Sequence, residues 1–208
     1  MPGPNELLLQ LQDRFAGIAH TVLNQVEETP DLTGGVGETY LGLWRGIAGS
    51  VCAMATLDLA APPSLAIQSV VGRFLICVKR LTEFDENPLF LGMLGGRVGL
   101  LLCAAELTNY FGLSAHREWL RAYVPHFAET VSRHDDLRPD FGSGYAGLLC
   151  GLVWISGMLD LRLDDAIRRL SQRCLDKLVL APQGRWSRII VGTVLWEGRV
   201  ASPTVRVG

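Results

Sequence analysis

Three stretches of similar sequence decide the fold: TYLGLWRGIAGSVCAMATL at 39–57, LFLGMLGGRVGLLLCAAEL at 89–107 and RPDFGSGYAGLLCGLVWI at 138–155. Each contains Gly-x-x-Gly followed by small and apolar residues, and the second glycines follow one another at intervals of 50 and 48 residues. A regular interval of this length indicates a structural repeat. Glycines three apart share a helix face, so we expect close backbone approach there, with the first glycine in a special φ. The pairs are Gly46 with Gly49, Gly96 with Gly99, and Gly144 with Gly147.

The sequence around these stretches predicts amphipathic helices. Apolar residues recur at three-and-four spacing within 64–81, 117–131 and 164–180, and a similar segment at 5–26 precedes the first repeat. The glycine stretches are apolar on all sides, which is typical of buried helices. Each unit of about 50 residues therefore pairs one buried helix with one surface helix. We expect an all-α fold, a partial α/α toroid of helical hairpins with the buried helices inside.

The composition sets the broad class of protein. The chain has 208 residues, of which 49% are hydrophobic, so it can bury a sizeable core and is not disordered. Its 19 basic residues are outnumbered by 21 acidic ones, giving a net charge of −2. Without an excess of positive charge, we expect no nucleic-acid partner.

The cysteines and the longest uncharged stretch bear on location. The cysteines are odd in number and widely spaced without a CxxC, which favours reduced thiols in the cytoplasm over a disulfide framework. A zinc site from Cys52, Cys103 and Cys150 is conceivable, but buried cysteine more commonly acts as a small apolar residue. The stretch 141–159 has no charged residue over a length close to that of a membrane span. Its repeat pattern recurs among charged residues elsewhere, so we expect a buried helix and no membrane span.

Further features of the glycine stretches resemble the lanthionine synthetase C family. The family has a repeated Gly-x-Ala-Gly after a short aromatic-Leu lead. Here Gly-Ile-Ala-Gly at 46–49 follows Tyr40, and Gly-Tyr-Ala-Gly at 144–147 is followed by a further amphipathic segment and then Trp186. Phe90 supplies the lead of the second repeat. This resemblance implies an α/α toroid.

The resemblance also implies a chemistry. In the family, a bound zinc activates a peptide cysteine as thiolate, which adds to a dehydrated Ser or Thr and closes a thioether ring. An aspartate before a glycine stretch is one family residue proposed for acid–base work on the resulting enolate, and Asp140 matches that position. Asp140 follows Pro139 and could equally be a helix cap or turn residue. The resemblance thus implies a zinc-dependent peptide cyclase with Asp140 as candidate catalytic residue.

The sequence departs from the family where zinc is bound. The family has a His directly before Gly-x-x-Gly in a later repeat, whereas this sequence has Arg45, Gly95 and Ser143 there. The family's zinc ligands are a Cys and a later Cys-His pair, and this sequence has no Cys-His dipeptide. We therefore assign no metal ligand and expect no cofactor in this chain as it stands, although the family uses zinc.

The resemblance covers about residues 35–187 and predicts a truncated toroid domain at 1–186 with a divergent tail at 187–208. We expect an incomplete cyclase that is inactive alone, with a peptide substrate or a completing protein segment as partner. An open ring would expose an apolar inner face, so self-association is a further expectation. The alternative is a non-catalytic peptide- or protein-binding α/α module. An unrelated toroid, such as a glycosidase-like ring, would need two carboxylates where only Asp140 is found.

Overall fold

All the regular secondary structure in the described part of the chain is helical. The computed structural model describes residues 3–28, 41–44, 46–56, 64–82 and 91–179, and these contain seven helices and no strand. The all-α prediction is therefore confirmed for these residues. The expected tail at 187–208, Trp186, Tyr40 and Phe90 lie outside them. The helices are α1 (Pro4–Glu28), α3 (Ala48–Thr56), α4 (Leu65–Leu81), α5 (Arg97–Tyr110), α6 (Ser114–Val131), α7 (Tyr145–Leu159) and α8 (Asp164–Val179).

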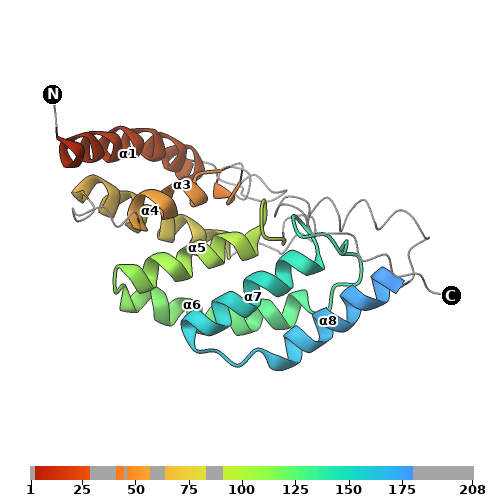
Figure 1. Cartoon of the computed structure of the whole chain (residues 1–208). Coiled ribbons are helices and arrows are strands. Elements are labelled where there is room, and N and C mark those ends of the chain that lie inside the picture. Colours follow the sequence, from red (N-terminus) through yellow and green to blue (C-terminus); the bar gives the residue numbers. More distant parts are fainter. Residues whose placement is uncertain (1–2, 29–40, 45, 57–63, 83–90, 180–208) are drawn as a thin grey trace.

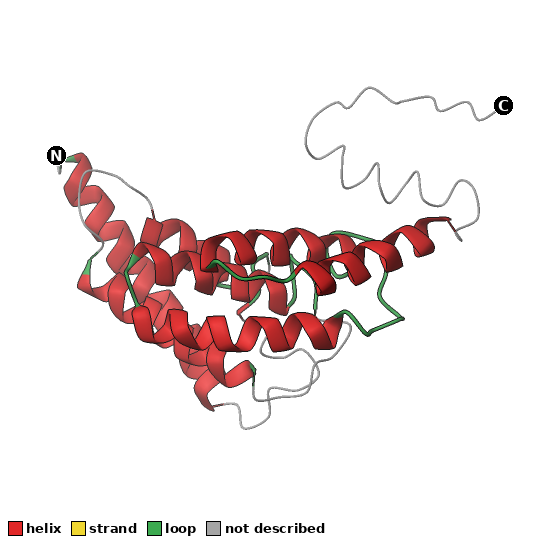
Figure 2. Ribbon diagram, turned by 90° about the horizontal axis from the view of Figure 1, so that it is seen from below, coloured by secondary structure: helices red, strands yellow, loops and turns green. Residues whose placement is uncertain are grey.

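The helices form two rows. Those that begin at the glycine stretches make one row, in which α5 packs against both α3 and α7 (Figure 1). The amphipathic helices pack against this row, with α4 on α3 and α5, and α6 on α5 and α7. Helix α1 packs on α4, and α8 packs on α6 and α7. Figure 2 shows the same helices from below. Each helix that begins at a glycine stretch thus packs against amphipathic helices, as expected, while closure into a ring stays a prediction.

Local sequence explains the outer helices. Helix α4 begins after Ser64, whose Oγ accepts a hydrogen bond from the backbone N–H of Ile67 at 3.3 Å, as an N-cap does. Its buried face consists of apolar residues at three-and-four spacing, as the sequence predicts. Helix α6 begins at Ser114, three residues before the expected start. No helix in the described ranges is long and apolar enough to cross a membrane.

The three glycine turns lie side by side at one end of the buried row. The backbone N–H of Trp44 donates to the carbonyl of Leu94 at 2.9 Å, and the N–H of Leu94 donates to the carbonyl of Gly142 at 3.1 Å. These two bonds join each turn to the next. Hydrogen bonding of successive turns fixes the register of α3, α5 and α7, because each helix starts directly after its turn.

Glycine is needed in these pairs because a side chain would not fit there, and not because the backbone adopts an unusual angle. A Cβ on Gly49 would lie 2.7 Å from the carbonyl oxygen of Leu43, and Gly99 and Gly147 would each meet the carbonyl six residues earlier in the same way. The expectation that the first glycine adopts a special φ is wrong. Gly96 and Gly144 have φ of −127° and −117°, in the extended region that any residue adopts. What requires glycine at each second position is the approach of the preceding turn to the first turn of the helix.

Candidate functional site

A cavity of about 690 Å³ lies along the row of buried helices. Its walls come from the first glycine turn and from α3, α5 and α7, with no residue from the amphipathic helices. It therefore belongs to the face of the row that those helices leave uncovered. The lining residues are Leu43, Gly49, Cys52, Leu102, Cys103, Glu106, Val153, Trp154, Gly157 and Met158.

The walls of this inner cavity are mainly apolar. Trp154 and Val153 on α7 keep 57% and 48% of their surface exposed, although both are large hydrophobic residues. Leu43, Leu102 and Met158 are partly buried and pack against the core. An apolar hollow with exposed aromatic and aliphatic side chains is the usual form of a site for an apolar ligand group.

Two thiols and one carboxylate supply the polar groups of the cavity. Cys52 on α3 is half-buried, and Cys103 on α5 is 3% exposed. The Cys103 thiol donates a hydrogen bond to Cys52 and thereby holds the pKa of Cys52 below its usual value, against the opposing effects of burial and of Glu106. The same hydrogen bond, together with burial, raises the pKa of Cys103 well above its usual value. The hydrogen bond therefore favours ionisation of Cys52 over ionisation of Cys103.

The cysteines of the repeats do not assemble as a zinc site. Cys52 and Cys103 meet, but Cys150 is not among the residues that line the cavity. Within the described ranges, no three His, Cys, Asp or Glu side chains are placed to hold a metal ion. The described residues thus do not fit the zinc that the resemblance implies.

Asp140 lies in the turn before α7 and outside the cavity wall. Its Oδ1 accepts a hydrogen bond from the backbone N–H of Ser143 at 2.8 Å and a second from Ser143 Oγ at 3.3 Å. These contacts are those of a turn residue that organises the approach to a helix. They support the structural interpretation of Asp140, while the catalytic interpretation stays a prediction.

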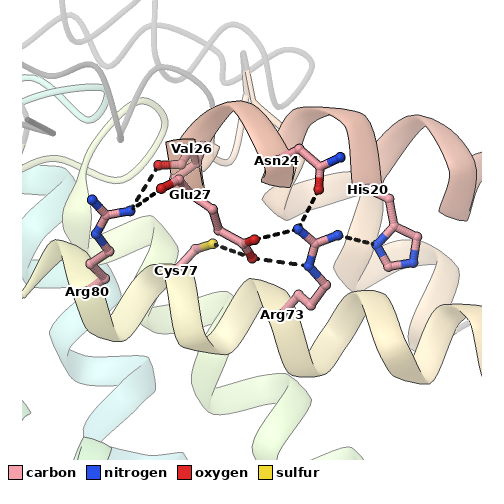
Figure 3. Close-up of polar contacts among 7 residues, drawn as sticks. All are labelled: His20, Asn24, Val26, Glu27, Arg73, Cys77 and Arg80. Carbon is pink, nitrogen blue, oxygen red and sulfur yellow. Dashed lines mark hydrogen bonds and ion pairs between the residues drawn. The ribbon is translucent and has the colours of Figure 1, made fainter. Parts of the chain in front are cut away.

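A polar network lies away from the cavity, between α1 and α4. Arg73 donates to both carboxylate oxygens of Glu27, at 3.1 Å and 2.7 Å, and also to Asn24 Oδ1 at 2.7 Å (Figure 3). His20 Nδ1 lies 2.8 Å from the same guanidinium, and Arg80 donates to the Glu27 carbonyl at 2.9 Å. The guanidinium holds the pKa of Glu27 below its usual value. Because its ion pair and hydrogen bonds join two helices, this network holds α1 against α4.

The sequence did not lead us to predict Cys52, Cys103 and Glu106 as one site. Sequence reasoning considered Cys52 and Cys103 only as zinc ligands or apolar residues, and it did not select Glu106. A signal was present, because the two cysteines follow the second glycines of their repeats by three and four residues. Equivalent positions in neighbouring units face one another once the helices are in register. In comparisons with protein-family models, curated proteins and solved structures, the chain matches none.

Proposed function

We propose that the chain is a peptide-binding α/α module, a partial toroid of the lanthionine synthetase C kind, whose inner cavity receives an apolar segment of a peptide. The observation that carries this proposal is the apolar cavity of about 690 Å³ on the uncovered face of α3, α5 and α7. Its volume lies in the range of sites that bind small ligands or side chains.

The lining also favours one chemistry of peptide. Trp154 and Val153 offer apolar surface, and Glu106, which is exposed, places a carboxylate at the same cavity. A peptide with large apolar residues beside a Lys or Arg fits these groups, because the cation pairs with Glu106 while the apolar side chains leave water.

A neutral apolar dye, Nile red, tests the cavity directly. We expect it to bind the intact chain, and Val153→Asp to weaken binding by about tenfold or more, because the new charge must be desolvated. Ile76→Asp is the matched control: Ile76 on α4 is 59% exposed and does not line the cavity, so its change should leave the dye affinity unaltered. A synthetic peptide containing Leu, Phe and Lys should displace the dye. Equal effects of the two substitutions, or no displacement, would contradict the proposal.

The second candidate function is peptide cyclisation, as the resemblance implies. It is favoured by Asp140 in the matching position and by the three hydrogen-bonded glycine turns. In that function zinc would supply thiolate activation, and no described residue set is assigned to hold it. A dehydrated peptide with one cysteine, incubated with the chain and zinc, decides between the candidates. Retention of the peptide thiol supports the binding module, whereas consumption that Asp140→Asn abolishes assigns the cyclase.

The proposed partners follow from the uncovered face. A completing protein segment or a second copy of the chain would cover the same apolar surface as the peptide. A cytoplasmic location is proposed from the reduced state of the cysteines, all five of which are thiols. Mass in solution, measured with and without the peptide, separates self-association from peptide binding.

A further inference from the structure

Two thiols from different helices meet at the wall of the inner cavity. Cys52 on α3 and Cys103 on α5 are hydrogen-bonded side chain to side chain, and both line the cavity. Their helices pack together, and the turns before them are joined by the hydrogen bond from Trp44 to Leu94. The pair is therefore positioned by the packed scaffold, although its members are distant in sequence.

The two thiols differ in ways that suit two chemical roles. Cys52 is half-buried and reaches the cavity, so a small molecule can contact its sulfur. Cys103 is almost fully buried beside it. The hydrogen bond favours the thiolate at Cys52, which is the nucleophilic form, and keeps the proton on Cys103. Cys52 is therefore suited to attack first and Cys103 to react with the product.

We propose that Cys52 and Cys103 form a hydroperoxide-reactive dithiol site that closes reversibly to a disulfide. The Cys52 thiolate attacks the terminal oxygen of a hydroperoxide, the O–O bond breaks, and the leaving oxygen takes a proton as water or an alcohol. Cys103 then attacks the sulfur of the Cys52 sulfenic acid. The S–O bond breaks, the S–S bond forms, and the thiol proton leaves with the hydroxyl as water. Two thiols are oxidised and one hydroperoxide is reduced.

The first step prepares the second. The largest cause of the raised pKa of Cys103 is its hydrogen bond to Cys52. Once Cys52 is a sulfenic acid, the thiol–thiol hydrogen bond that favours the protonated form of Cys103 is lost, while burial and Glu106 continue to raise the pKa of Cys103. The chemistry needs no peptide ligand, so this inference is independent of the proposed function.

Mass spectrometry of the intact chain tests the proposal. The reduced protein is treated with one equivalent of hydrogen peroxide or of cumene hydroperoxide, then unfolded in urea and labelled with N-ethylmaleimide, so that the buried thiols also react. We expect three labelled cysteines in place of the five of the reduced chain, and a cross-link between tryptic peptides 46–73 and 98–117 that a reductant removes. The hydroperoxide that reacts at the lower concentration identifies the preferred substrate. Full labelling after both treatments, or a cross-link that involves Cys150, would overturn the proposal.

Single substitutions separate the roles. Cys103→Ser should abolish the cross-link and leave a Cys52 sulfenic acid that dimedone traps, while Cys52→Ser should abolish both products. Cys77→Ser is the control, because Cys77 is buried in α4 and its pKa is raised to about 11, mainly by burial. It should cross-link as the unmodified chain does. Dimedone capture at Cys103 in the Cys52→Ser variant would show that Cys103 itself attacks the hydroperoxide. That result would refute the proposed order of attack.

Discussion

Each second glycine of the repeated pairs is required by one close contact between backbone groups. At Gly147 an added Cβ would overlap the carbonyl of Phe141 and lie 3.0 Å from the backbone N of Met93 in the neighbouring turn. Neither neighbour is the end of a flexible side chain, so neither can move without shifting a turn. At the residue scale, these glycines are therefore part of how one unit packs on the next.

This contact predicts opposite effects of the same substitution at two glycines. Gly147→Ala should destabilise the fold by about 1–3 kcal/mol, because the methyl group overpacks the turn. Gly72→Ala, in the middle of α4 with nothing within 4 Å of an added Cβ, should stabilise by up to about 1 kcal/mol through helix propensity. Urea unfolding of the two variants and the unmodified chain measures both changes. A higher midpoint for both variants would show that helix propensity alone governs these positions, and a lower midpoint for Gly72→Ala would contradict the prediction at that residue.

At the scale of elements, α1 depends on α4 for its position. Its described contacts are mainly with α4, and a polar network and an apolar seam join the two helices (Figure 3). A second polar link lies at the other end: Gln12, 1% exposed, accepts a hydrogen bond from the Ser64 N–H at 3.1 Å and donates one to the Met54 carbonyl at 3.4 Å. Both ends of α1 are thus fixed to the units that follow.

The ion pair of Arg73 with Glu27 predicts a pH dependence. Arg73 lowers the pKa of Glu27 below its ordinary value of 4.5. The stabilisation of the fold by this ion pair is therefore present above about pH 4.5, and it is lost as the pH falls through the lower pKa that Glu27 has in the folded chain. Glu27 is 41% exposed, so solvent screening limits the effect to about 0.5–1 kcal/mol. Glu27→Gln should reduce stability by this amount at pH 7 and flatten the acid limb of the stability curve. Chemical unfolding between pH 3 and 7 measures it.

The control for this prediction removes the same charge one residue further along. Glu28→Gln should leave the difference in stability between pH 7 and pH 4 as it is in the unmodified chain. If the two substitutions flatten the curve equally, general charge and not the pair with Arg73 is responsible.

The sequence predicted elements better than it predicted contacts between them. Apolar spacing and the Ser64 cap place α4 at 65–81 against an expected 64–81, because both signals are local. Asp140 could not be assigned from sequence, since an Asp that caps a turn and an Asp that transfers a proton look alike there. Its bond to the Ser143 N–H is one that a turn residue makes. The pairing of Cys52 with Cys103 depends on how α3 stacks on α5, which the repeat spacing suggests but does not fix.

At the scale of the whole molecule, the described helices lie in two rows, and one row has an apolar face that none of the described amphipathic helices covers. The amphipathic helices cover one side of α3, α5 and α7, and the cavity occupies the other. The two proposals use this same face, one for an apolar peptide segment and one for a hydroperoxide. Oxidation would also join two successive units covalently, which affects the stability of the whole described fold.

A disulfide between Cys52 and Cys103 should stabilise the folded chain. It would close a loop of about 50 residues and restrict the unfolded ensemble, which contributes up to about 4 kcal/mol before any strain in the native state is subtracted. We expect a higher urea midpoint for the peroxide-treated chain than for the reduced chain, with the difference removed by a reductant. Cys77→Ser should keep the difference and Cys103→Ser should lose it. A lower midpoint after oxidation would mean that closing the S–S bond distorts the packing of α3 on α5 by more than the cross-link gains.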